Sequence, residues 1–456
     1  MLQTFKNAWK VPELRKKLLF TAMIILLYRI GANLYVPYVD VAKIKDFADY
    51  FSQTGSFFQM INLFSGGAFS NATFFALSVS PYITASIVMQ LLTIAIPALE
   101  RLSKQGEEGK KKITAITRWV TIGLALITAY GYVVMLENGT NMGSMLTISK
   151  ADGFMYYFGY AVMIACFCTG AAVIMWLAEQ VNDHGIGNGI SMILFANIVS
   201  RGLAMVTGMI GMLKVPTYDT TGLIVTGETW ATGGKLVLGI FEVILSLALT
   251  VAIIGLIVWF TNSERRIPIQ YAKRVVGRKM YGGQSSNLPL KMNMAGVMPV
   301  IFGSSIVSIP ATIAGFMREN GYTRWVEKWF NFDKPLYIIV FTLLIFAFSY
   351  FYIMISFNPV EVANNIRNNG GAVPGIRPGK PTADYIKKIL NRITLMGAIF
   401  LIVIAVMPMI VTAIAPSFSS IAFGGTSLLI IVGVALETVR DLEAQLAMRN
   451  YKGFLD

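Results

Sequence analysis

Ten long apolar segments alternate with polar or basic stretches along this chain of 456 residues. About 20 apolar residues suffice to cross the hydrocarbon core of a bilayer as a helix. Open strands cannot satisfy their backbone hydrogen bonds in lipid, so each segment is predicted to be helical. The predicted spans are residues 18–36, 73–97, 117–136, 154–178, 189–211, 236–260, 292–316, 337–357, 393–414 and 424–440. The pattern therefore predicts an all-α polytopic membrane protein.

Composition supports this fold class and excludes others. Hydrophobic residues make up 55% of the chain and charged residues 14%, whereas soluble proteins carry roughly 25% charged residues. A disordered chain, a disulfide scaffold and a plain soluble enzyme are excluded. Cys166 and Cys168 lie in one apolar run, and His184 is the single histidine. No disulfide framework, thiolate site or multi-histidine site is available, so no metal or cofactor is expected.

Basic residues lie mainly on one predicted side of the membrane. Of the 38 Lys and Arg residues, 27 lie on the side of the two termini and 9 on the other. Cytoplasmic loops carry such an excess, so both termini are predicted to be cytoplasmic. Two basic segments, residues 261–291 and 358–392, are longer than topology requires. They are predicted to be docking arms for an acidic or RNA-bearing partner.

Two weak sequence matches indicate an internal repeat. Pro81-Tyr82-Ile83 in the second span matches Pro299-Val300-Ile301 in the seventh, 218 positions later, and residues 189–194 match 425–430. Five spans per half is an odd number, so the halves are predicted to have inverted topology with a pathway at their interface. The predicted division is a cytoplasmic tail at 1–17, halves at 18–211 and 212–440, and a cytoplasmic tail at 441–456.

Aliphatic side chains recur on the repeated segments. Val79 and Ile83 are four residues apart and share a helix face, as do Ile190 and Leu194. Their counterparts in the second half are Ile301 and Ile430. Ordinary packing explains most such residues. The other interpretation is a ring of aliphatic side chains that seals a wide pathway by excluding water.

Two other classes of function fit less well. A small-solute carrier with the same repeat needs polar or charged side chains at the midplane. The ionisable residues inside the spans are few: Arg29, Arg201, Glu242 and, near the end of the last span, Glu437. A membrane enzyme has no evident nucleophile or phosphate loop to support it. We therefore favour a pore over a carrier.

Several stretches resemble one known family from end to end of the chain. They are FALSVSPYITASIVMQLLTI, INLFSGGAFS, GIGNGISMILF, YAKRVVGRKMYGGQSSNLPLK, VPGIRPG and FGGTSLLI. They are similar to the SecY family, the channel subunits of the bacterial Sec protein translocase. Ser78 stands where this family usually has glycine. The resemblance implies a clamshell of ten transmembrane helices in two inverted five-helix halves. It also implies a multi-pass protein of the bacterial plasma (inner) membrane that is a pore subunit and not an enzyme.

The resemblance further implies roles for particular residues. The pore ring carries over onto Val79, Ile83, Ile190, Leu194, Ile301 and Ile430. A plug at about 57–67 carries over onto Met60, Ile61, Asn62, Leu63, Phe64, Ser65, Gly66 and Gly67. Gln90 and Asn293 are candidates along a lateral gate between spans 2 and 7. Docking of the SecA motor or the ribosome carries over onto Lys273, Arg274, Arg278 and Arg377. We expect apolar contact alone to hold the plug.

The implied activity is passage of unfolded secretory polypeptides across the membrane and sideways release of membrane-protein segments into lipid. Signal sequences would open the channel. The implied partners are SecE as an obligate subunit, SecG, and either the SecA ATPase or the translating ribosome as the source of energy. No sequence-specific binding of nucleic acid is expected.

Overall fold

The computed structural model describes most of the chain. It covers residues 2–40, 43–44, 62, 64–138, 145–148, 153–202, 214–218, 224–230, 234–271, 274–276, 279–281, 285–317, 320–330, 334–414 and 424–452. The helices are α1 (Leu2–Lys10), α2 (Pro12–Gly31), α5 (Ser80–Ala95), α6 (Pro97–Ser103), α7 (Glu107–Asn138), α8 (Phe154–His184), α9 (Gly189–Ser200), α11 (Gly234–Asn262), α12 (Met298–Val307), α13 (Ile309–Phe316), α14 (Gly321–Trp329), α15 (Pro335–Ser356), α16 (Pro359–Asn368), α17 (Lys380–Ile414) and α19 (Gly424–Lys452). The strands are β1 (Lys214–Tyr218), β2 (Ile224–Trp230), β3 (Glu264–Tyr271), β4 (Arg274–Val276), β5 (Lys279–Tyr281), β6 (Ser285–Lys291) and β7 (Gly371–Ala372).

Every predicted span overlaps a helix, and the seventh is divided between α12 and α13. Five helices of the described residues are long and apolar enough to cross a membrane on their own, and the bent pair α5–α6 makes a sixth. Helices α9 and α12–α13 are apolar but shorter. The protein is therefore a helical membrane protein, as the apolar pattern predicted.

Several helix ends differ from the prediction because charged residues continue a helix beyond its apolar part. Helix α2 begins at Pro12 rather than at residue 18, α17 begins at Lys380 rather than at 393, and α19 continues to Lys452. Lysine, arginine and glutamate are good helix formers, so a helix need not end where its sequence becomes polar. Hydropathy marks only the part of the helix that lipid requires.

Other helices are shorter than the predicted spans or are interrupted within them. The second span begins at Ser80 rather than at residue 73, because the chain turns through a positive φ of 51° at Ser78. Proline also opens a new helix: Pro310 lies in the first turn of α13, directly after the break at Ser308. Proline lacks the amide hydrogen of a helix interior but suits a first turn. Helix α9 ends at Ser200, and residues 203–211 of the fifth span lie outside the described residues.

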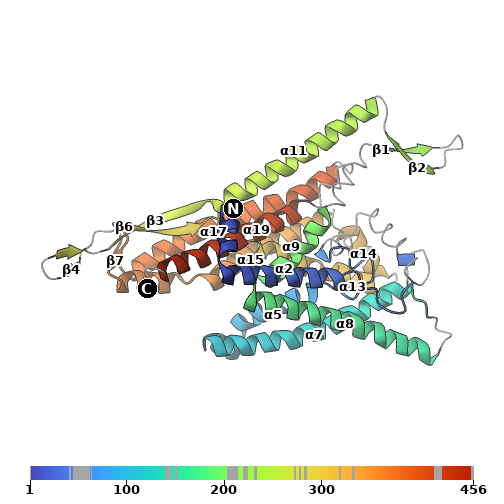
Figure 1. The fold of residues 1–456 in the computed structure, drawn as a ribbon, viewed down its shortest axis with the longest axis horizontal. Coiled ribbons are helices and arrows are strands. Elements are labelled where there is room, and N and C mark those ends of the chain that lie inside the picture. The colour runs from blue at the N-terminus through green and yellow to red at the C-terminus, as the bar shows by residue number, and fades with distance from the viewer. Residues whose placement is uncertain are drawn as a thin grey trace.

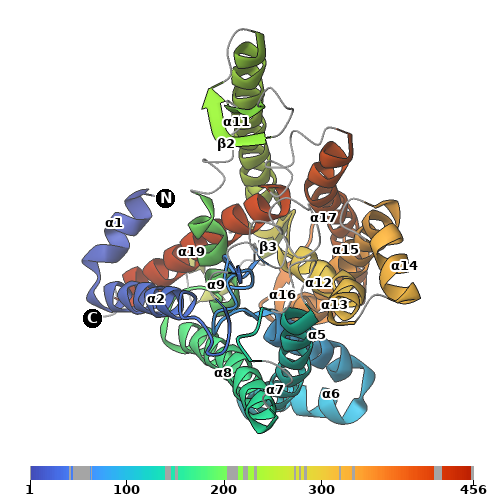
Figure 2. The same cartoon turned by 90° about the vertical axis from the view of Figure 1, so that its right-hand side faces the viewer.

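The two halves pack their helices in the same order. In the first half α5 packs on α7, α7 on α8, and α8 on α9; in the second α12 packs on α15, α15 on α17, and α17 on α19. Figure 2 shows these two groups side by side, with α5, α7 and α8 below and α12, α15 and α17 to the right. The halves meet where α5 contacts α12 and where α9 contacts α19. These are the helices that carry the repeated sequence segments.

The repeat also appears in backbone detail. Helices α5 and α12 each begin after a valine, Val79 with φ −84° and ψ −5° and Val297 with φ −93° and ψ −8°, and each has proline in its first turn. Helices α9 and α19 each begin with a glycine that lies against the preceding helix: a Cβ on Gly189 would meet Ala178 of α8, and one on Gly425 would meet Pro408 of α17. The structure therefore supports the weak sequence matches.

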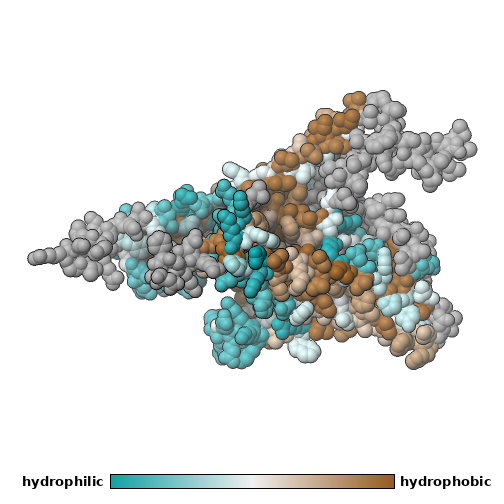
Figure 3. Space-filling model, viewed as in Figure 1, coloured by the Kyte–Doolittle hydropathy of each residue, from teal (hydrophilic) through white to brown (hydrophobic). Residues whose placement is uncertain are grey.

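The two basic segments form one unit. Strands β3 and β6 pair over seven residue positions from Glu264↔Lys291 to Gln270↔Ser285, and β7 of the second segment pairs with β3 through Gln270↔Ala372. The prediction that 358–392 is a loop is wrong in part, because α16 and the start of α17 occupy most of it. Figure 1 shows the strands projecting from one end of the helices, and hydrophilic residues gather toward that end in Figure 3.

Candidate channel site

Five of the six predicted ring residues lie in one buried hydrophobic cluster. Val79 precedes the first turn of α5 and Ile83 follows one turn later, Leu194 lies on α9, Ile301 on α12 and Ile430 on α19. Ile190 is partly buried and packs against the same cluster. The cluster therefore draws on both halves of the chain, at the two places where they meet.

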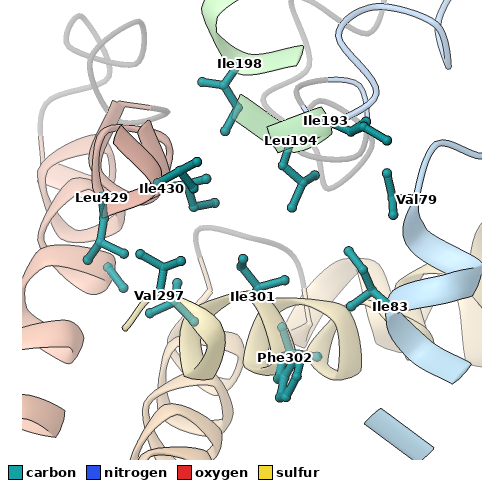
Figure 4. Close-up of a cluster of buried hydrophobic side chains, with 14 of the residues drawn as sticks. Val79, Ile83, Ile193, Leu194, Ile198, Val297, Ile301, Phe302, Leu429 and Ile430 are labelled. Atoms are coloured by element: carbon teal, nitrogen blue, oxygen red, sulfur yellow. The ribbon is translucent and has the colours of Figure 1, made fainter. Parts of the chain in front are cut away.

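Figure 4 shows how these side chains converge. Val79 and Ile83 approach from one side, Leu194 from above, Ile301 from below and Ile430 from the opposite side. Ile430 has no exposed surface. Because the side chains shown are hydrocarbon, they provide no hydrogen-bonding partner for water or ions.

Sequence reasoning missed several members of this cluster. They are Ile193, Ile198, Val297, Phe302 and Leu429. Three of them could have been found from the spacing of one helix face. Ile193 follows Ile190 by three residues, Ile198 follows Leu194 by four, and Val297 precedes Ile301 by four. Phe302 and Leu429 follow no such spacing from a predicted member and needed the packing of the helices.

The predicted plug is described only at Asn62 and 64–67, so Met60, Ile61 and Leu63 lie outside the described residues. The described part is a compact turn. The Ser65 hydroxyl donates to the carbonyl of Asn62 at 3.1 Å, and the amide of Ser70 donates to Asn62 Oδ1 at 3.1 Å.

Polar contacts also tie this turn to the helices around it. The carbonyl of Phe64 accepts hydrogen bonds from Asn197 Nδ2 at 2.7 Å and from the Ser78 hydroxyl at 3.2 Å. The expectation that apolar contact alone holds the segment is therefore wrong. The sequence had shown Asn197 only as a polar interruption of the fifth span.

The two predicted gate residues have different surroundings. Gln90 lies on α5 and its amide donates to Ser86 Oγ of the same helix at 3.5 Å. Asn293 is 9% exposed and lines a cavity of about 140 Å³ together with Lys291, Glu437 and Arg440. Burial lowers the pKa of the Lys291 ammonium, and the charge of Arg440 lowers it further.

A larger apolar cavity lies along the line where α5, α7, α12 and α13 meet. Its volume is about 280 Å³, and it is bordered by Pro81 and Thr84 of α5, Ile127 of α7, and Thr312 and Ile313 of α13. Its surface is hydrocarbon with scattered hydroxyl groups. Such a surface suits an apolar segment with few polar atoms.

The predicted docking residues are described only in part. Lys273 and Arg278 lie outside the described residues, and Arg274 begins β4. Arg377 is exposed, and its carbonyl accepts a hydrogen bond from the Thr382 hydroxyl at 2.9 Å. Gly375 and Gly379 on either side have φ of 79° and 101°. These positive φ values allow the chain to turn tightly on both sides of Arg377.

Titratable side chains of the described residues do not gather into a metal-binding group. Among the residues that the structure describes, no three His, Cys, Asp or Glu side chains are close enough to hold a metal ion. Glu242 lies on α11, but its side chain is not among those described. A polytopic helical protein whose two halves meet at an aliphatic closure belongs to the class of membrane channels.

Comparison with known proteins identifies the family. The SecY family model matches residues 73–439. A protein translocase subunit SecY from Streptomyces galbus is 42% identical over 457 residues, which is 100% of both chains. The chain belongs to the SecY family. Its class is that of a protein-conducting channel subunit, and the alternative of a small-solute carrier is wrong.

Solved structures support the fold. A protein conducting channel matches with a TM-score of 0.59 and 18% identity, over 96% of each chain. A second match is a SecY protein whose plug domain is described as stabilising the closed state and maintaining a membrane seal. Its TM-score is 0.57 and its identity 17%, again over 96% of each chain. Sec61 from the canine ribosome–channel complex matches with a TM-score of 0.55 and 16% identity, over 96% of each chain.

Proposed function

We propose that this chain is the central pore of a translocase, which passes unfolded secretory polypeptides across the membrane and releases apolar segments sideways into lipid. The observation that carries the proposal is the aliphatic cluster at the meeting line of the two halves. A narrow apolar neck excludes water and ions. Flexible aliphatic side chains can also rearrange around a passing chain of varied sequence, which a rigid polar site could not do.

The six predicted ring residues form the seal, and the segment at 57–67 is the plug that covers it. The plug assignment is supported by the contact between its described end and the helices that carry the ring. Phe64 packs against the buried cluster and its carbonyl is bound by Asn197 of α9. A segment held in this position blocks the pathway without contributing to the ring itself.

The lateral gate is the contact between α5 and α12, with Gln90 and Asn293 as polar residues along it. The two helices belong to different halves and pack directly on each other. The apolar cavity of about 280 Å³ beside this contact supports the assignment. It offers hydrocarbon surface to an apolar segment that leaves the pore for lipid.

The sheet of β3, β6 and β7 and the loop that carries Arg377 form the docking surface for SecA or the ribosome. Both elements come from the two long basic segments and project from the same end of the molecule (Figure 1). Lys273, Arg274 and Arg278 complete this surface. SecE and SecG are the accompanying subunits. The basic bias puts this end and both termini in the cytoplasm of a bacterial cell, with the spans in the plasma membrane.

Reconstitution tests the proposal. The full chain is co-purified with a SecE-like subunit, placed in vesicles, and supplied with SecA, ATP and an unfolded precursor. We expect protease-protected precursor inside the vesicles, dependent on its signal sequence. Absence of protected precursor in vesicles that retain the folded complex would contradict the proposed function.

A further inference from the structure

The carbonyl of Phe64 is held by side chains from two separate parts of the chain. Asn197 of α9 donates through Nδ2 at 2.7 Å, and the hydroxyl of Ser78, in the turn before α5, donates at 3.2 Å. A carbonyl oxygen has two lone pairs, so both bonds can form together. We name Asn197, Ser78 and the Phe64 carbonyl the plug latch.

The amide of Asn197 is fixed in this orientation by a third helix. It has no exposed surface, and its Nδ2 also donates to the hydroxyl of Tyr28 on α2 at 2.9 Å. Tyr28 is itself fully buried and stacks on Phe75 with ring centroids 5.3 Å apart. Both hydrogens of the Asn197 amide therefore donate, one to the Tyr28 hydroxyl of α2 and one to the Phe64 carbonyl of the plug.

The oxygen of the same amide accepts no hydrogen bond from the described residues. Within the described part of the chain Asn197 Oδ1 is buried and has no hydrogen-bond partner. It faces Gly66, where an added Cβ would lie 3.0 Å from it. A buried acceptor without a partner costs free energy. Packing alone would favour an apolar residue here, so the asparagine contributes through Nδ2, which donates to the Tyr28 hydroxyl and to the Phe64 carbonyl.

Ser78 leads to the same conclusion by a different route. Its φ of 51° lies in the left-handed region, which glycine adopts without strain and serine does not. Glycine would therefore be the less strained residue at this turn. The serine contributes a hydroxyl, and that hydroxyl donates to the Phe64 carbonyl.

We propose that Asn197 is a positioning residue of the channel, which together with Ser78 holds the Phe64 carbonyl and so sets how readily the plug leaves its closed position. The inference rests on the proposed function and deepens it, because it assigns the threshold for opening to two named donors. The latch acts on the plug and does not contact the translocating chain in this arrangement.

Thiol labelling of the plug measures its displacement directly. Cys166 and Cys168 are the only cysteines of the chain, so they are replaced by alanine and Ser65→Cys is introduced. Ser65 is fully buried, so a thiol there is protected while the plug is seated. The rate of reaction with a water-soluble maleimide in reconstituted vesicles reports the displaced fraction.

We expect Asn197→Leu to raise the labelling rate about fivefold, the factor that corresponds to one net hydrogen bond. Ser78→Ala keeps the strained backbone and removes only the hydroxyl, and it should raise the rate by a similar factor. The double variant should exceed the product of the two factors, because it leaves the carbonyl with neither donor.

The matched control is Asn33→Leu. Asn33 Nδ2 also donates to a backbone carbonyl, that of Arg29 at 2.8 Å, and not to one of the described plug residues. This control should label at the parent rate. Thermal unfolding and retention of the SecE-like subunit are measured for every variant. Asn197→Leu also removes the hydrogen bond to Tyr28, so it should lower thermal stability, whereas Ser78→Ala should stay close to the parent. Ser78→Ala therefore separates plug positioning from a general loss of structure.

The outcomes distinguish the latch from the pore. Parent-like labelling of Asn197→Leu and Ser78→Ala in folded complexes would overturn the latch, even if the parent translocates precursor normally. If Asn197→Leu fails to fold, Ser78→Ala decides the question alone, because its change lies in a turn. Failure of the parent to translocate would count against the proposed function and leave the labelling comparison valid.

Discussion

In the channel that we propose, the ring and the plug latch are two closures of one pathway, and they depend on different interactions. The ring consists of aliphatic side chains from α5, α9, α12 and α19, and its contacts have no preferred direction. The latch consists of directional hydrogen bonds to the Phe64 carbonyl. Apolar contact tolerates changes of shape but not of polarity. A hydrogen bond depends on geometry, so the two closures should fail for different reasons.

They also differ in where their residues come from. Ring members lie on both halves, whereas Tyr28, Phe64, Ser78 and Asn197 all belong to the first half. Separation of the halves would pull the ring apart, because its residues lie on α5 and α9 of the first half and on α12 and α19 of the second, and α5 contacts α12 while α9 contacts α19. The same motion would not separate the residues of the plug latch, because they all belong to the first half. We therefore expect the two closures to open in separable steps.

A polar residue in the ring should have the largest effect on the resting leak. Ile430 has no exposed surface, and an amide there would lack a partner at a cost of about 2 kcal/mol. Ile430→Asn should raise ion conductance of the resting channel by roughly tenfold or more and allow export of precursors with weak signals. Conductance in planar bilayers checks this. Unchanged conductance and unchanged signal selectivity would show that the ring is ordinary packing.

A geometric change at the latch should have the next largest effect. Gly66 has φ of 66°, and an added Cβ would lie 3.0 Å from Asn197 Oδ1 and 3.1 Å from both terminal nitrogens of Arg29. Gly66→Ala should displace the plug and raise resting conductance about fivefold while export continues. Conductance and precursor uptake measure the two effects.

Gly67→Ala is the matched control for that change. Its φ of 93° imposes similar backbone strain, but within the described part of the chain an added Cβ would have only Asn71 Nδ2 within 4 Å, at 3.9 Å. The difference between the two alanine variants therefore isolates the contact with Asn197 and Arg29. Equal conductance of the two variants would mean that strain alone governs the plug.

A change of shape in the ring should have a small effect. Ile301→Val removes one methyl group from a buried side chain and leaves the surface apolar. We expect a loss of about 1 kcal/mol in the free energy of unfolding with no increase in conductance. Thermal unfolding and bilayer recording test both parts. A marked leak would show that exact packing, and not polarity, keeps the ring closed.

A change outside both closures should leave the leak as it is. Arg377→Glu reverses a charge on an exposed tip between two glycines of positive φ, so we expect normal resting conductance and strongly reduced SecA-driven uptake. Uptake by Arg377→Lys should lie between that of the parent and that of Arg377→Glu, because lysine keeps the charge but loses the planar donor group. Full uptake with both variants would remove Arg377 from the docking surface.

Site residues that are related by local helical spacing could be predicted from the sequence, whereas those that meet through long-range contacts could not. Val79 and Ile83 share one helix face, so spacing alone connected them, and the repeat extended the ring to the second half. The latch could not be found this way. Asn197 and Phe64 are separated by 133 positions, and the segment between them contains three spans whose packing no periodicity specifies.

The sequence by itself determined the membrane class, the approximate spans, the repeat and the aliphatic residues of the ring. These follow from hydropathy and helical spacing, which are local properties of the chain. Only the tertiary structure decided that β7 joins β3 across 100 positions, from Tyr271 to Gly371, and that an asparagine inside a span binds the carbonyl of Phe64. Both depend on how distant segments pack, because a hydrogen bond forms only when folding brings donor and acceptor together.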